Sequence, residues 1–318
     1  MSPVALPAAV RRATRWAARA LVEPPLPLVA LEVRPRAVAA VRLAHEGGRL
    51  SLGAATTVDL PPGAVEVSLA RPNLADPAAF REALRSVMER VGGLSGGDVS
   101  LVLPDPVVRL ALVSAEGLRG SGREAEETIR FRLHKALPFD VRSARLAWSP
   151  TRGEQLLVAV ALDDVVRGYE EALESLGFRP GLVEAASLAL LVAAEDPPAS
   201  GDRLLVNWDD GYVSFVLTRA GQPLLVRTLP GDAKPDAVAR HASSTRQFYE
   251  DRLGGTALDD VLVRSAAVPG EEALALLGRA LCAAPRLLQP WAALGVTEEG
   301  PSAQAVAGAA ACVLRRAA

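Results

Sequence analysis

The side chains that could carry catalytic chemistry are few and scattered along the chain. Three histidines stand far apart and there are only two cysteines, so no metal-ligand spacing is present. His241 precedes Ser243 and Ser244, but all three lie in a helical pattern without the strand–turn–helix context of a nucleophilic serine. The glycine pairs before the strand-like run 98–103 lack the Lys-Ser/Thr of a phosphate-binding P-loop. We therefore expect neither a hydrolase nor a metalloenzyme.

Length and composition indicate a large globular protein. The chain has 318 residues, of which 50% are hydrophobic and 23% charged, so it is long enough for two domains and apolar enough for a real core. Its net charge is −2. Nucleic-acid binders usually carry a strong basic excess, so we expect no nucleic-acid partner.

No stretch of the sequence is long enough to cross a membrane. The longest apolar runs, Ala185–Ala194 (broken by Ser187) and Ala305–Leu314, fall short of the roughly 20 residues that a spanning helix needs. Residues 1–27 are expected to form a basic amphipathic helix and a Pro-rich linker. An arginine-faced helix of this kind can lie on an anionic membrane, dock a partner or pack on its own domain, and these alternatives stay open.

Two stretches share one succession of three strand-like runs, a helix and a further strand. The expected elements of the first stretch are Leu28–Val33, Ala37–Leu43, Arg49–Val58, a helix after the capping residue Asp76, and Asp98–Leu103. Those of the second stretch are Leu204–Trp208, Tyr212–Thr218, Leu224–Thr228, Pro235–Leu253 and Val261–Arg264. The repeat predicts an α/β protein with the actin-like fold, in which two ribonuclease-H-like lobes flank a cleft.

A small α/β subdomain is expected between the two stretches. Its predicted elements are Val107–Val113, Gly122–Ala136, Arg145–Ser149, Gln155–Ala161 and Asp163–Leu176. The predicted division of the chain is residues 1–27 for the N-terminal helix and linker, 28–103 plus 179–200 for the first lobe, 104–178 for the inserted subdomain, and 201–318 for the second lobe.

Five segments in order resemble the PilM family of type IV pilus assembly proteins, whose relatives include FtsA and the cytoplasmic domain of GspL. The resemblance extends over residues 28–316. Leu31–Leu43 aligns without a gap on the family's first phosphate segment, L-D-I-G-x-x-x-V-K-x-V-x-L. The other segments are Ala136-Leu137-Pro138-Phe139, Glu170–Glu184 leading into the connecting helix, Val206–Pro230 as the second phosphate segment, and Tyr249-Glu250.

The resemblance implies a nucleotide site, but this chain departs from the family pattern in its first phosphate turn. Glu32 stands at the acidic position and is one methylene longer than the usual aspartate. Arg34 replaces the glycine, Pro35 removes a backbone donor, and Ala39 stands where the family has lysine. Glycine permits close approach of the backbone to phosphate, so these changes weaken the turn as a phosphate cradle.

The second phosphate turn departs from the pattern as well. Asn207 replaces the aspartate, and Asp209, which would repel phosphate, replaces the following glycine. A shifted frame ending at Gly211 restores an Asp-x-Gly triplet but breaks the gapless match. The acid of the connecting helix is Glu184 where the family has aspartate. On the adenosine side, Ser265-Ala266 stands where the family has Gly-Gly.

Two interpretations of these substitutions stay open. Arg34 and Arg36 could clamp phosphate with their side chains, because guanidinium forks match phosphate oxygens. Alternatively, they pair with Asp209, Asp210 or Glu184 across the cleft and hold the lobes together without a ligand. Because both turns and the adenosine motif are altered together, we expect weak or absent binding of ATP and Mg²⁺ and no useful hydrolysis.

The resemblance also implies a function. It predicts a cytoplasmic scaffold, peripheral at the inner face of the inner membrane, that binds the N-terminal peptide of a PilN-like bitopic membrane protein in a groove between the first lobe and the insert. Contact with the pilus motor ATPase and self-association belong to the same expectation. The alternatives are a nucleotide-binding, filament-forming actin-like ATPase and a GspL-like component of type II secretion.

Overall fold

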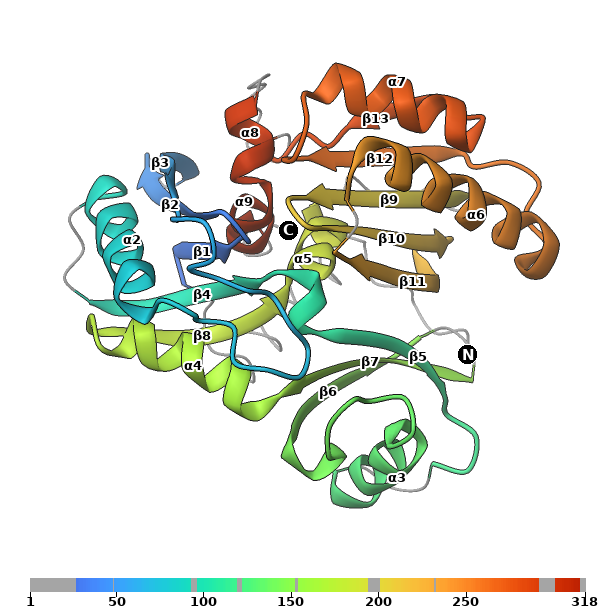
Figure 1. Ribbon diagram of the computed structural model, residues 1–318, viewed down its shortest axis with the longest axis horizontal. Helices are drawn as coiled ribbons and strands as arrows, with labels where there is room; N and C mark the ends of the chain where they lie inside the picture. The colour runs from blue at the N-terminus through green and yellow to red at the C-terminus, as the bar shows by residue number, and fades with distance from the viewer. Residues whose placement is uncertain are drawn as a thin grey trace, which may run out of the picture.

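The computed structural model describes residues 27–47, 49–92, 96–118, 122–151, 154–193, 201–231, 233–291 and 301–314. Within these residues the chain forms two five-stranded sheets, one three-stranded sheet and the helices around them (Figure 1). The predicted N-terminal amphipathic helix lies outside the described residues. Among the helices that are described, none is long and apolar enough to cross a bilayer.

The first five-stranded sheet has the order β3-β2-β1-β4-β8. Its strands are β1 (Val29–Val33), β2 (Ala37–Glu46), β3 (Arg49–Asp59), β4 (Gly97–Leu103) and β8 (Phe178–Ala185). β1 to β3 form antiparallel hairpins, whereas β4 runs parallel to both β1 and β8. β1 is buried along its whole length, which explains its continuous apolar run around Glu32.

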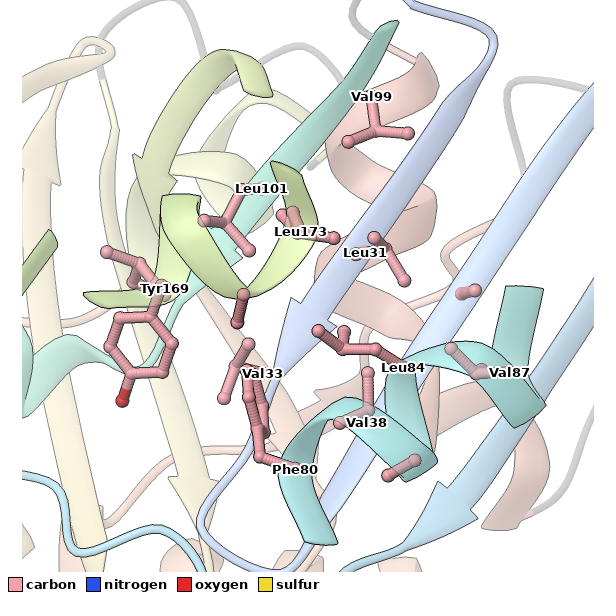
Figure 2. Packing of buried hydrophobic residues seen from close by; sticks show 14 of the residues in the cluster. Leu31, Val33, Val38, Phe80, Leu84, Val87, Val99, Leu101, Tyr169 and Leu173 are labelled. Atoms are coloured by element: carbon pink, nitrogen blue, oxygen red, sulfur yellow. The ribbon is translucent and has the colours of Figure 1, made fainter. Parts of the chain in front are cut away.

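Helices α2 (Pro77–Arg90) and α4 (Asp163–Glu174) cover one face of this sheet (Figure 1). The side chain of Asp76 caps α2 by accepting hydrogen bonds from the N–H groups of Ala78 and Ala79, as the Asp-Pro start predicts. Figure 2 shows Tyr169 and Leu173 of α4 in the core with α2 and the strands, and the Tyr169 ring meets Phe80 edge-on at 5.7 Å.

The predicted division therefore needs a correction at α4. The sequence division placed the predicted helix Asp163–Leu176 in the insert. Its buried side chains nevertheless belong to the core of the first sheet. The predicted position of Glu184 also needs correction, because this residue lies in strand β8 and not in the connecting helix, which begins at Ala186.

The second five-stranded sheet repeats the order of the first, as β11-β10-β9-β12-β13. Its strands are β9 (Asp202–Asp209), β10 (Tyr212–Arg219), β11 (Gln222–Pro230), β12 (Asp260–Ser265) and β13 (Pro285–Leu287). Helices α6 (Pro235–Leu253) and α7 (Gly270–Leu281) lie along one side of this sheet in Figure 1. The predicted duplication of the three strands, helix and strand is present.

Two helices without charged residues lie between the sheets, α5 (Ala186–Ala193) and α9 (Ala307–Leu314), and the short α8 (Pro301–Ala305) precedes α9 (Figure 1). α9 is buried throughout and packs on β1, β2, β4 and α5. The sequence division placed α9 in the second lobe, whereas its core contacts include Ala30 and Val102 of the first sheet together with Leu205 and Leu262 of the second. The lobes thus share one apolar core.

The inserted sheet has the order β5-β7-β6 and carries helix α3. Its elements are η1 (Asp105–Val107), β5 (Arg109–Ser114), α3 (Arg123–Leu133), η2 (Val141–Ser143), β6 (Ala144–Pro150) and β7 (Gln155–Leu162). Arg145 of β6 forms ion pairs with Asp163 and Glu170 of α4, so charged side chains tie the insert to the helix that packs on the first sheet.

Candidate functional site

The β1–β2 turn places Arg34 at the boundary between the lobes. The backbone N–H of Arg34 donates to the carbonyl of Ala37 at 2.8 Å, and Pro35 has no N–H. Two donors that a phosphate-binding turn would present are therefore not available for a ligand. Arg36, the second predicted clamp residue, is exposed on this turn.

In the β9–β10 turn, too, a backbone N–H group is already used within the protein. Asp209 and Tyr212 are paired across a two-residue turn, and Gly211 adopts a φ of 75°, a conformation that favours glycine. The backbone N–H of Asp210 donates to Oδ1 of Asp209 at 2.8 Å. The carboxylate of Asp209 thus accepts the hydrogen bond that the N–H of Asp210 could otherwise donate to a bound anion.

Asp209 and Arg34 form a buried ion pair between the lobes. Arg34 donates from Nε to Oδ2 at 2.9 Å and from Nη2 to Oδ1 at 2.8 Å, a bidentate arrangement. The relative exposure of the Arg34 side chain is 7% and that of Asp209 is 0%. The expected pairing of Arg34 with Asp209 is present in the structure, and Arg34 Nη2 also donates to the carbonyl of Ala266.

Arg264 of β12 joins this pair to a second carboxylate. Its Nη1 donates to Oδ2 of Asp209 at 2.5 Å, and its Nη2 donates to Oε1 of Glu32 at 2.9 Å. Glu32 also accepts from the backbone N–H of Gly308 at 3.0 Å, at the start of α9. The four side chains alternate in charge, with Arg34 and Glu32 on the first sheet and Asp209 and Arg264 on the second. We call Glu32, Arg34, Asp209 and Arg264 the interlobe network.

Burial and charge act on this network in opposite directions. Burial raises the pKa of Glu32 above its ordinary value, against the attraction of Arg264 and Arg34. Burial by itself would also raise the pKa of Asp209, but the two arginines outweigh it and hold that pKa well below 3.8. The pKa of Arg264 is raised because Asp209 and Glu32 outweigh the effect of its burial. Asp209 is therefore firmly ionised.

A second buried cluster lies next to the network. Asn207 accepts from Nη1 of Arg264 at 3.1 Å and donates from Nδ2 to Oδ2 of Asp105 at 2.9 Å. Asp105 in turn accepts from the backbone N–H of Ser187 at 2.8 Å, at the start of α5. This chain of hydrogen bonds links η1, α5 and β9, and it uses the polar atoms of Asn207 within the protein.

The predicted adenosine side is also satisfied internally. Ser265 donates from its backbone to Oε1 of Gln304 at 3.3 Å and from Oγ to the carbonyl of Val268 at 2.7 Å. The backbone N–H of Ala266 donates to the carbonyl of Trp208 at 2.9 Å. The backbone carbonyl of Gln304, on α8, accepts a hydrogen bond from Nε of Arg264 at 3.0 Å.

Of the predicted site residues, the structure brings together Glu32, Arg34, Asn207, Asp209, Ser265 and Ala266. Ala39 is a buried residue of β2 opposite Glu32 in the sheet. Glu184 lies on β8, in register with Val102 of β4. Within the described part of the chain, no group of His, Cys, Asp or Glu side chains is placed to hold a metal ion.

Sequence reasoning missed Arg264, Asp105 and Gln304. Arg264 stands in the run Val261-Leu262-Val263-Arg264 of a buried strand, and a charge in such a run predicts a buried partner without saying which one. Asp105 lies between two prolines directly after β4, a place where a buried carboxylate can accept from the start of a helix. No sequence signal marks Gln304.

Two duplicated lobes facing each other across a shared core, with an insert in the first, define the actin-like fold. Comparison with solved structures confirms this fold and, at the level of the fold, the resemblance to PilM. PilM of the PilM–PilN type IV pilus biogenesis complex has 19% identical residues and a TM-score of 0.75 over 93% of this chain and 100% of that chain. A protein of actin-like ATPase fold and unknown function from Bacteroides thetaiotaomicron has 8% identity and a TM-score of 0.52, over 82% and 90%.

A looser likeness links the chain to the cytoplasmic domain of EpsL, an inner-membrane component of the type II secretion system of Vibrio cholerae. The identity is 12% and the TM-score 0.48, over 76% of this chain and 82% of that domain. Comparison with models of protein families finds no match. Comparison with curated protein sequences finds none either.

Proposed function

We propose that this protein is a scaffold of a type IV pilus or related secretion assembly that binds a PilN-like partner and does not use nucleotide. The observation that carries the proposal is the likeness to PilM over 93% of the chain. That PilM structure is part of a complex with PilN. We infer that this chain binds the cytoplasmic N-terminal peptide of a PilN-like bitopic membrane protein and lies at the inner face of the inner membrane.

The interlobe network supports the part of the proposal that concerns nucleotide. The backbone N–H groups of Arg34 and Asp210 are already used within the protein, and Pro35 has none. The carboxylate of Asp209 lies where the resemblance places a phosphate-binding glycine. A triphosphate brought to this position would meet two buried carboxylates, Asp209 and Glu32, and would have to displace them from their arginines. The residues present do not fit a bound nucleotide with its Mg²⁺.

The shared apolar core supports a rigid scaffold. α5 and α9 fill the space between the sheets with small apolar side chains, and the interlobe network adds a charged connection that needs no ligand. A nucleotide switch requires two arrangements of the lobes that a ligand binds with different affinity. Here the contacts that hold the lobes together are made by the chain alone.

The direct test measures binding of a fluorescently labelled PilN-type N-terminal peptide by anisotropy, with and without millimolar Mg-ATP. The proposal predicts saturable binding with the same affinity in both conditions, and none by a scrambled peptide of equal charge. Failure of the peptide to bind in any buffer would contradict the scaffold proposal. A nucleotide-dependent affinity, together with polymer formation, would favour a filament-forming ATPase instead.

Two variants localise the partner. Arg145 lies at the junction of the insert and α4, where the peptide groove is expected, and R145A removes a side chain that is 40% exposed. Arg123 of α3 also forms an ion pair, with Glu127, and its side chain is 92% exposed, so R123A serves as the matched control. We expect weaker peptide binding for R145A and unchanged binding for R123A. Phe131 is 73% exposed on α3 and lines a surface pocket of about 470 Å³.

A further inference from the structure

Four hydrogen-bond donors from three residues converge on one carboxylate, that of Asp209. They are Nε and Nη2 of Arg34 at 2.9 and 2.8 Å, Nη1 of Arg264 at 2.5 Å, and the backbone N–H of Asp210 at 2.8 Å. Two guanidinium groups and a turn N–H are the donor set that proteins use for phosphate and carboxylate ligands. Here the chain supplies the anion itself.

We propose that Arg34 and Arg264 form an oxyanion-binding site whose built-in occupant is the carboxylate of Asp209. The inference rests on the proposed function, in which this site takes no nucleotide. It supplies the reason that no nucleotide binds, because a carboxylate of the same chain occupies the site. An external phosphate or carboxylate must displace Asp209 from both arginines before it can bind.

Because the guanidinium groups of Arg34 and Arg264 are buried, they require an anion beside them. The side chain of Arg264 is 0% exposed and that of Arg34 is 7% exposed, so a neutral water molecule in place of the carboxylate would leave the charge of both guanidinium groups uncompensated. Removing one member of a buried charge pair leaves the other uncompensated, which is strongly unfavourable. A variant without the Asp209 carboxylate would therefore retain two cations aimed at a vacant position.

The charge balance predicts which anion fits. The interlobe network contains two cations, Arg34 and Arg264, and two anions, Glu32 and Asp209, so it is neutral when all are ionised. Without Asp209 it carries one net positive charge. The vacant site should then prefer a small anion of charge −1, and formate or acetate matches the group that was removed.

The test is chemical rescue of Asp209→Gly. Thermal unfolding is measured in sodium formate, sodium acetate, monobasic phosphate and sodium chloride at equal ionic strength. D209G should melt below the wild type in chloride, and formate or acetate should raise its melting temperature in a saturable manner, as expected for a ligand that binds only the folded state. Rescue by phosphate as well extends the site to phosphate-bearing ligands, and rescue by carboxylates alone restricts it to carboxylates. Both results support the proposal.

Asp140→Gly is the matched control. Asp140 also accepts from an arginine through two side-chain nitrogens and from a backbone N–H, all of them of Arg142. The Arg142 side chain is 86% exposed, so bulk water can replace the lost carboxylate. No anion should stabilise D140G or the wild type more than chloride does. Equal effects of formate on D209G and D140G, or no effect beyond chloride on D209G, would overturn the inference.

If D209G does not fold, refolding of Asp209→Ala from denaturant keeps the inference falsifiable. The folded fraction recovered in formate should exceed that in chloride severalfold, and equal recovery contradicts the proposal. Titration of the wild type with Mg-ATP separates this result from the proposed function. Binding of ATP would overturn the nucleotide-free scaffold, whereas absent rescue with no ATP binding would overturn the self-occupied anion site alone.

Discussion

Replacing Arg264 with methionine removes the cation that two buried carboxylates share. Methionine has a similar length and no charge, so the change leaves Glu32 without its guanidinium and Asp209 with Arg34 alone. Loss of one member of a buried pair costs about 3–5 kcal/mol of unfolding free energy. We expect R264M to be destabilised by this amount, as measured by equilibrium unfolding in urea.

A double-mutant cycle separates the charge effect from lost packing. Glu32→Gln combined with R264M removes both members of one pair and leaves the neutral Arg34–Asp209 pair, so the double variant should recover about 1–3 kcal/mol relative to the sum of the single changes. Arg286→Met is the control, because its exposed pair with Asp260 is worth about 1 kcal/mol or less. A loss in R264M no larger than that in R286M would refute the reasoning.

Two further substitutions test the contacts of the network. Gly308→Ala places a Cβ 2.5 Å from Cδ of Glu32 and should lower the free energy of unfolding in urea by about 1–3 kcal/mol. Gly168→Ala on α4 is the control, because its Cβ would meet free space, and it should raise the free energy of unfolding by about 0.5–1 kcal/mol. Equal effects of the two substitutions would contradict the tight contact at Gly308. Asp209→Asn tests the ionised state of Asp209, whose folded pKa is depressed, so its charge contributes fully above pH 3.8 and progressively less below it. The gap in unfolding free energy between D209N and the wild type should shrink by about 1.4 kcal/mol per pH unit below that value, and a gap independent of pH would exclude the effect.

The elements of the two repeated units could be predicted because each carries a local signal, whereas strand β8, helix α7 and strand β13 were not predicted. The Asp76-Pro77 start of α2 and the limits of α6 at Pro235 and Leu253 were recovered from capping residues and spacing. The duplicated order of strands then leads to the actin-like fold. The boundary of the insert could not be predicted, because the apolar face of α4 could pack on either sheet and only the tertiary structure decides between them.

The site could be predicted only in part, for a related reason. Arg34 and Asp209 lie in turns that the resemblance brings together, so their pairing could be anticipated. Arg264 lies 232 residues from Glu32 in sequence, and its strand pattern does not reveal its partner. The contacts of Glu32 with the start of α9 depend on the packing of a helix that the sequence division placed in the other lobe.

We propose that the protein's own charged side chains fill the position where the resemblance implies a nucleotide site. Isothermal titration of the wild-type protein with Mg-ATP tests it most directly. We expect no saturable heat of binding up to millimolar nucleotide, because Asp209 is already held by both arginines and Glu32 by Arg264. Binding of Mg-ATP with micromolar affinity would contradict it.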